Sequence, residues 1–214
     1  MIEIKSLRAA DSGSVILCEI KICDEDCNEK RTYRLLPEQY KELRLAKGEI
    51  SEDDLSNILD ADELCRALRS GRASLAYSAS SEAALKQKLR TKGFSARAAQ
   101  AAVDRLTKEN AITEEDDATR EAEKCLRKLW GRNRIITHLR SKGYRRESID
   151  SAMSALRYTD FSIVCHKAIK KKWGTLPQNT EDAPTARDRA IASLIRLGFS
   201  TGEINNACKI RDDE

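Results

Sequence analysis

The chain has 214 residues, of which 40% are hydrophobic, 35% charged and only 5% aromatic, with a formal net charge of +4. This composition favours slender, well-solvated helices over one thick globule. No stretch approaches the roughly 20 apolar residues of a membrane span, and the start of the sequence lacks the basic and apolar regions of a signal peptide. We therefore expect a soluble, cytoplasmic protein.

The charge is unevenly distributed along the chain. Residues 1–80 contain 12 basic and 16 acidic side chains, whereas residues 81–214 contain 27 and 19. Within residues 124–172, 14 basic side chains face only 3 acidic ones. A window this basic predicts a polyanionic partner, such as nucleic acid or an acidic protein groove.

The first 59 residues predict a small antiparallel sheet followed by short helices. Residues 2–7 begin an extended segment, residues 15–22 form a strand and residues 32–35 form its partner, with turns at 11–14 and 24–28. Pro37 suits the first turn of a helix that runs to about Leu45, and Gly48 stops it. Ser51-x-x-Asp54 offers an N-cap for a second helix.

In residues 60–214 the apolar side chains recur at the spacing of an α-helix, and one segment occurs three times. The copies are Leu89-x3-Gly93-Phe94, Leu139-x3-Gly143-Tyr144 and Leu194-x3-Gly198-Phe199, spaced by 50 and 55 residues. Each glycine follows the last turn of a helix, where a left-handed backbone closes the helix without steric cost. The aromatic residue can then fold back onto the leucine, which joins this helix to the next.

Each copy belongs to a predicted unit of three helices. Repeat 1 covers residues 60–110, repeat 2 covers 111–157 and repeat 3 covers 158–214. The helices of repeat 2 are expected at 113–130, 131–142 and 145–156, and those of repeat 3 at 161–173, about 186–197 and about 200–209. Residues 174–185 form a polar, proline-containing loop inside repeat 3. The predicted fold is mainly α, an elongated array of helix-turn-helix-like repeats after a small sheet.

Ten basic side chains in repeats 2 and 3 are the candidate binding surface. On the predicted helix 131–142, Arg134 and Arg140 point away from the apolar side, and the lysines near residue 170 complement the negative end of their helix. A solvated helix face is the alternative explanation for any one of them. The ten residues are Lys128, Arg132, Arg134, Arg140, Arg145, Arg146, Lys167, Lys170, Lys171 and Lys172.

The sequence gives little support for catalysis or for a metal or cofactor site. The only histidines, His138 and His166, lie in two different predicted helices, and no hydrolase, zinc-protease or phosphate-cradling motif is present. Cys18, Cys23 and Cys27 lack a second ligand pair at zinc-site spacing. Seven cysteines are an odd number, which favours reduced thiols. We expect no enzyme activity, no cofactor and no metal.

The order and spacing of these units resemble the RecX family of bacterial regulators of the RecA recombinase. The residues that carry this resemblance are Ser81-Glu82-x2-Leu85-x3-Leu89-x3-Gly93-Phe94, Gly131-x3-Ile135-x3-Leu139-x3-Gly143-Tyr144, the third copy, and Tyr33-Arg34-Leu35-Leu36-x-Glu38. The resemblance implies three tandem three-helix repeats that lie along the groove of the RecA–DNA filament. It also implies inhibition of strand exchange, ATP hydrolysis and coprotease activity, with a role in recombination, DNA repair and the SOS response.

Two other functions remain open from the sequence. Three-helix units resemble helix-turn-helix domains, so the chain could bind single- or double-stranded DNA directly without RecA. It could also be a scaffold for another acidic partner. Tight, sequence-selective binding to a DNA duplex in the absence of RecA would favour the first of these.

Overall fold

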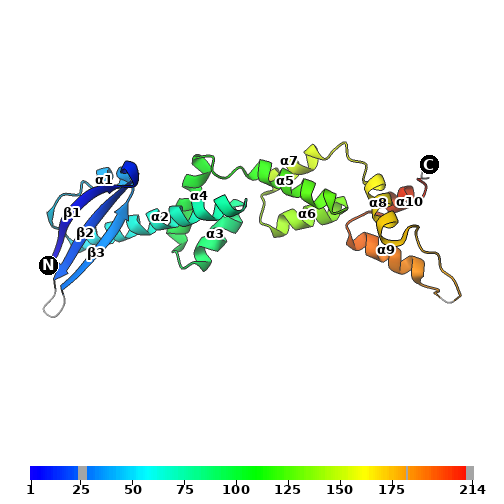
Figure 1. Cartoon of the computed structure of the whole chain (residues 1–214), viewed down its shortest axis with the longest axis horizontal. Helices are drawn as coiled ribbons and strands as arrows, with labels where there is room; N and C mark the ends of the chain where they lie inside the picture. Colours follow the sequence, from blue (N-terminus) through cyan, green and yellow to red (C-terminus); the bar gives the residue numbers. More distant parts are fainter. Residues whose placement is uncertain (24–27, 182, 211–214) are drawn as a thin grey trace. The chain divides into compact units, whose positions relative to one another are not determined.

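The computed structural model describes residues 1–23, 28–181 and 183–210, and Figure 1 shows the order of its elements. The described residues form two compact units: Met1–Ser78 with Leu85–Ile112, and Ala79–Ala84 with the chain from Thr113 onward. The predicted mainly helical fold with a small antiparallel sheet is confirmed. No helix in these described ranges is long and apolar enough to cross a membrane.

The first unit begins with a four-stranded antiparallel sheet. Its strands are β1 (Ile2–Ala10), β2 (Val15–Cys23), β3 (Asn28–Leu35) and β4 (Gly48–Glu49), in the order β3-β2-β1-β4. A 3-10 turn, Asp11–Gly13, joins β1 to β2. Residues 24–27 of the predicted turn at 24–28 lie outside the described residues. The strand β4 was not predicted: Gly48 does follow a helix, but it also pairs with β1.

Helix α2 joins the sheet to the first helical repeat. After α1 (Pro37–Glu42), α2 runs unbroken from Glu52 to Tyr77, so the boundary expected after residue 59 falls inside a helix. Ser51 caps it as predicted, because its Oγ accepts a hydrogen bond from the N–H of Asp54 at 3.0 Å. The side chain of Ile58 packs on the sheet, whereas that of Leu68 lies in the next core cluster.

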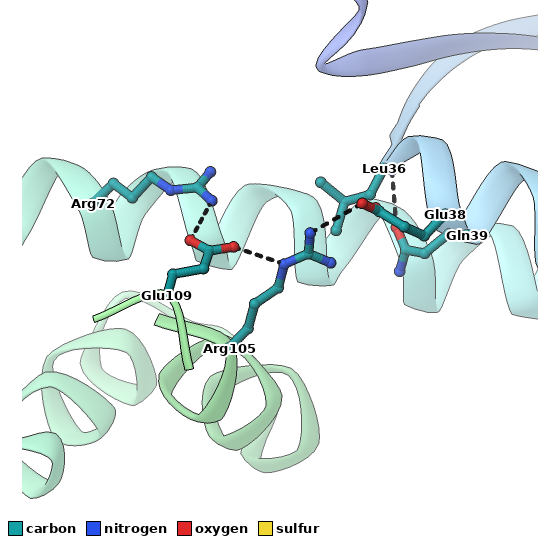
Figure 2. A network of polar contacts seen from close by, with 6 residues as sticks. All are labelled: Leu36, Glu38, Gln39, Arg72, Arg105 and Glu109. Atoms are coloured by element: carbon teal, nitrogen blue, oxygen red, sulfur yellow. Dashed lines mark hydrogen bonds and ion pairs between the residues drawn. The ribbon is translucent and has the colours of Figure 1, made fainter. Parts of the chain in front are cut away.

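Helices α3 (Glu82–Thr91) and α4 (Ala96–Lys108) complete the first repeat. Ser81 and Ser95 cap them by accepting backbone hydrogen bonds at 3.1 Å. Figure 2 shows a chain of charged contacts that ties α2, α4 and α1 together. Arg72 contacts Glu109 at 2.8 Å, Glu109 contacts Arg105 at 3.0 Å, and Arg105 contacts Glu38 at 3.4 Å.

The second unit holds repeats 2 and 3 around one shared hydrophobic cluster. Burial raises the pKa of the Cys165 thiol in this cluster to about 12, and that of Cys18 in the sheet to about 11. None of the cysteines within the described part of the chain forms a disulfide. The helices of this unit are α5 (Glu114–Arg127), α6 (Arg132–Ser141), α7 (Arg146–Ala155), α8 (Phe161–Trp173), α9 (Ala186–Arg196) and α10 (Thr201–Ala207).

The three repeated glycines end their helices as predicted. Gly93, Gly143 and Gly198 have φ of 91°, 79° and 93°, which is the left-handed region that glycine adopts without penalty. In every copy the N–H of the following aromatic residue donates to the carbonyl of the leucine five positions earlier, at 3.2 Å. This double turn directs the chain from the second helix of each repeat into the third.

Candidate functional site

The ten predicted basic residues all lie in the second unit, but on several elements. Lys128 follows α5, the next three lie on α6, Arg145 and Arg146 begin α7, and the four lysines lie on α8. The structure gives these side chains different surroundings. Some line a common hollow, some pair with carboxylates, one lies over an aromatic ring, and the rest are exposed.

Trp130 organises the basic side chains at the junction of α5 and α6. Leu129 has φ of 59°, an unusual conformation for leucine, and lets the N–H of Trp130 donate to the carbonyl of Cys125 at 3.2 Å. The guanidinium carbon of Arg134 then lies 4.0 Å from the centre of the Trp130 ring, and the Nζ of Lys128 lies 5.5 Å from it. Cation–π contacts of this kind contribute about 0.5–2 kcal/mol each and fix the position of the cation.

The start of α6 docks against the end of α9 through the backbone. The N–H of Gly131 donates to the carbonyl of Leu197 at 2.7 Å, and the N–H of Asn133 donates to that of Gly198 at 3.1 Å. Opposite partial charges of two helix ends meet here. A Cβ atom on Gly131 would lie 2.3 Å from the carbonyl carbon of Gly198, so only glycine permits this approach.

A related contact joins the start of α3 to the end of α6. The Oγ of Ser81 donates to the carbonyl of Lys142 at 2.7 Å while it caps α3. A Cβ on Gly143 would lie 3.1 Å from the Cβ of Ala83 and 3.2 Å from the Oγ of Ser81. In both junctions, the glycine that ends one helix therefore lies against the N-terminus of the corresponding helix in the preceding repeat.

The junction of α6 and α9 brings three cations around one open hollow. Arg134 on α6, Lys172 on α8 and Arg196 on α9 line it together with Ser193 and Leu197. The Nζ of Lys172 donates to the Oγ of Ser193 at 2.7 Å, which holds the ammonium group over the hollow. Because the residues described as lining it include no carboxylate, this hollow suits an anion such as a phosphate or a carboxylate.

Arg196 is the member of this hollow that sequence reasoning missed. It lies beyond the basic window, and in the sequence it is 62 residues from Arg134. One signal was available: Arg196 occupies the last turn before the repeated Gly198, as Arg140 does before Gly143. That signal could not show which basic side chains meet in space, because the meeting depends on the contact between α6 and α9.

The structure gives Arg145 a different environment from Arg146. Arg145 contacts Glu82 and Glu114, and its backbone N–H donates to the carboxylate of Glu114 at 2.8 Å. The hydrogen bond to Glu82 raises the pKa of Arg145 above its usual range. Arg146 is exposed and lies 3.6 Å from Asp150, which is itself exposed. Arg145 therefore connects two repeats, whereas Arg146 faces solvent.

The remaining predicted residues lie at the surface of the same unit. Arg132 lies over the ring of Phe161 at 4.9 Å, and Lys172 lies over that of Trp173 at 4.5 Å. These contacts hold both cations near α8, so that Arg132 joins Lys172 there. Arg140, Lys167, Lys170 and Lys171 are exposed.

The two histidines are half-buried and hydrogen-bonded. The Nε2 of His138 lies 2.9 Å from the Oε1 of Glu121, and the Nδ1 of His166 lies 3.1 Å from the carbonyl of Ala207. Burial opposes the ionisation of Glu121, but the hydrogen bond with His138 and nearby lysines lower its pKa below the usual value. His138 lies on α6 and His166 on α8.

Comparison with known proteins decides the family. The model of the RecX first three-helix domain matches residues 67–106, which cover the second half of α2, all of α3 and most of α4. The regulatory protein RecX of Pelodictyon phaeoclathratiforme is 32% identical over 131 residues, which make up 59% of this chain and 76% of that protein. The chain belongs to the RecX family.

Solved RecX structures have the same fold. A crystal structure of regulatory protein RecX matches with a TM-score of 0.74 at 18% identity, covering 98% of this chain and 100% of that one. The crystal structure of RecX from Lactobacillus salivarius matches with a TM-score of 0.56 at 16% identity, covering 70% and 96%. The RecX fold therefore extends over the sheet as well as the repeats of this chain.

Proposed function

We propose that this RecX family member binds RecA–DNA filaments in the cytoplasm and mainly inhibits the ATPase, strand-exchange and coprotease activities of RecA. The family supports RecA as the partner. The hollow lined by Arg134, Lys172 and Arg196 is the observation that supports the basic surface of the second unit as the contact with the filament. No catalytic role is proposed, since the activity requires only binding.

The mechanism follows from the chemistry of this surface. Three cations that converge on one hollow attract phosphates of bound DNA or carboxylates of an acidic filament groove. Exposed Lys128, Arg140, Arg146 and Lys171 extend the positive charge over the same unit. A repeat array held in the filament in this way would obstruct the DNA access and subunit movements that strand exchange requires.

The decisive experiment reverses charge at the hollow without disturbing the core. Lys172→Glu and Arg196→Glu change two exposed side chains, whereas Arg134 is retained because it packs on Trp130. ATP hydrolysis by RecA on single-stranded DNA is measured against concentration of the double variant. We expect the concentration of protein that gives half-inhibition to rise roughly tenfold or more. Reversing charges at the rim of an interface slows association and so weakens binding.

A matched control separates local charge from net charge. Lys47→Glu with Lys108→Glu changes the net charge by the same amount, at two exposed positions of the first unit. This control should inhibit RecA as well as the wild type does. Equal inhibition by both double variants would remove the hollow from the interface.

Direct DNA binding is tested in the same preparation. If the wild-type protein leaves RecA activity unchanged at stoichiometric levels but binds duplex DNA tightly and selectively, the helix-turn-helix alternative replaces the RecA proposal. If DNA binding is weak and steeply salt-dependent, the basic surface contributes only charge.

A further inference from the structure

Three potential ligand side chains come together between α5 and α6. Glu121 and Cys125 are four residues apart on α5 and so lie on the same helix face, while His138 projects from α6. One ligand atom from each, a carboxylate oxygen, a thiol sulfur and an imidazole nitrogen, lie within 4.8 Å of one another. The sequence does not reveal this group, because its third member belongs to a different helix.

We propose that Glu121, Cys125 and His138 form a binding site for a divalent transition-metal ion of the zinc type. This set of sulfur, nitrogen and oxygen donors matches the ligands of zinc, whereas magnesium and calcium prefer oxygen alone. Zinc binds these atoms at about 2.0–2.3 Å, so ligands at tetrahedral corners are roughly 3.4 Å apart. Side-chain rotations that move the ligand atoms by about 1 Å would bring the three atoms to that spacing, with water as the fourth ligand.

The surroundings support each ligand. The Oε1 of Glu121 lies 2.9 Å from the Nε2 of His138, so a metal ion would take the place of the proton between them. The other oxygen, Oε2, lies 3.7 Å from the Nζ of Lys124, which orients the carboxylate from outside. The rings of Trp130 and His138 pack nearly perpendicular to each other, with ring centres 5.2 Å apart.

Access and charge are also compatible with an ion. Cys125 is completely buried, but Glu121 and His138 are partly exposed and provide an entry route from solvent. Burial, and then Glu121, raise the pKa of the Cys125 thiol, while the positive charges of Lys128 and Lys142 partly oppose this shift. Loss of the thiol proton gives two anionic ligands, thiolate and carboxylate, which together neutralise a divalent ion.

The site is independent of the proposed function, and its test needs no RecA. The reduced, metal-free, full-length protein is titrated with Co²⁺, a spectroscopic substitute for zinc. We expect tetrahedral visible absorption and a thiolate-to-cobalt charge-transfer band in the near ultraviolet, both saturating at one ion per chain. Excess Zn²⁺ should abolish both signals.

Two cysteine variants identify the ligand. Cys125→Ala should lose the charge-transfer band, whereas Cys165→Ala should keep it. Cys165 is a matched control because it is also completely buried in the second unit and neighbours a histidine in the sequence. A band that persists in Cys125→Ala, or no band in the wild type, overturns the proposal.

A third variant keeps the proposal testable if Cys125→Ala does not fold. Glu121→Gln retains the size of the side chain and its ability to contact His138. Its affinity for Co²⁺ should fall roughly tenfold or more, since even outer-shell partners of metal ligands contribute that much. Unchanged affinity in a folded Glu121→Gln variant would also reject the site. Circular dichroism establishes folding in each case.

Discussion

The contact between α6 and α9 predicts a large effect from adding a single methyl group. In Gly131→Ala, the new Cβ would lie 2.3 Å from the carbonyl carbon of Gly198, 2.4 Å from its oxygen and 2.5 Å from the nitrogen of Phe199. These are backbone atoms, so no side-chain rotation can relieve the overlap. The two helices must separate, and the hydrogen bond from Gly131 to Leu197 at 2.7 Å must lengthen or break.

The expected loss is about 3 kcal/mol of unfolding free energy. Overpacking in a tight interior costs about 1–3 kcal/mol, and the lost backbone hydrogen bond adds about 1 kcal/mol. Backbone strain does not contribute, because Gly131 has φ of −77°, which alanine adopts readily. For a chain of this size, the change corresponds to a fall in melting temperature of roughly 6–12 °C.

Thermal unfolding followed by circular dichroism measures this loss, and Gly202→Ala is the matched control. A Cβ on Gly202, in α10 of the same unit, would meet nothing within 4 Å, and alanine is the better helix former. That variant should keep its melting temperature or gain a few degrees. If Gly131→Ala has the same melting temperature as Gly202→Ala, then α6 and α9 do not approach as closely as described. The hollow that this approach creates would then be rejected as well.

Two further predictions concern charged contacts. The hydrogen bond from Arg72 lowers the pKa of Glu109, so the stability that wild type has over Glu109→Gln should be present at neutral pH and lost as pH falls below about 4. A difference that stays constant in urea titrations from pH 7 to pH 3 would contradict this. Arg145→Ala leaves the largely buried carboxylate of Glu114 without its cation and should cost about 1 kcal/mol, whereas Arg146→Ala should change unfolding free energy by less than about 0.5 kcal/mol. Equal effects in denaturant unfolding would show that Arg145 does not connect the repeats.

Local signals in the sequence predicted most of the helices and their ends. Ser51 caps α2, and the three repeated glycines adopt positive φ, because these preferences depend only on neighbouring residues. Helix ends without such a signal were less accurate. The first helix of repeat 2 was expected to reach Trp130 but ends at Arg127. The reason is that Leu129 adopts a left-handed backbone conformation, which the residue type leucine does not indicate.

The two Trp-Gly pairs illustrate the limit of pattern matching. Trp130-Gly131 and Trp173-Gly174 each mark a junction between helices. Gly131 is the extended N-cap of α6, however, whereas Gly174 ends α8 with φ of 76°. The same dipeptide therefore begins a helix in one repeat and ends a helix in the other. The reason is that the next helix starts at once in repeat 2 but only after a loop in repeat 3.

The sequence by itself determined the repeat, its helices and caps, the basic character of repeats 2 and 3, and the likeness to RecX. Those features depend on residue type and spacing along one chain. Only the tertiary structure decided that Arg134 and Lys172 meet Arg196, that Arg145 is paired with carboxylates, and that His138 lies beside Cys125. The physical reason is that each of these groupings depends on how separate helices pack, and a close backbone contact between glycines sets that packing at the hollow.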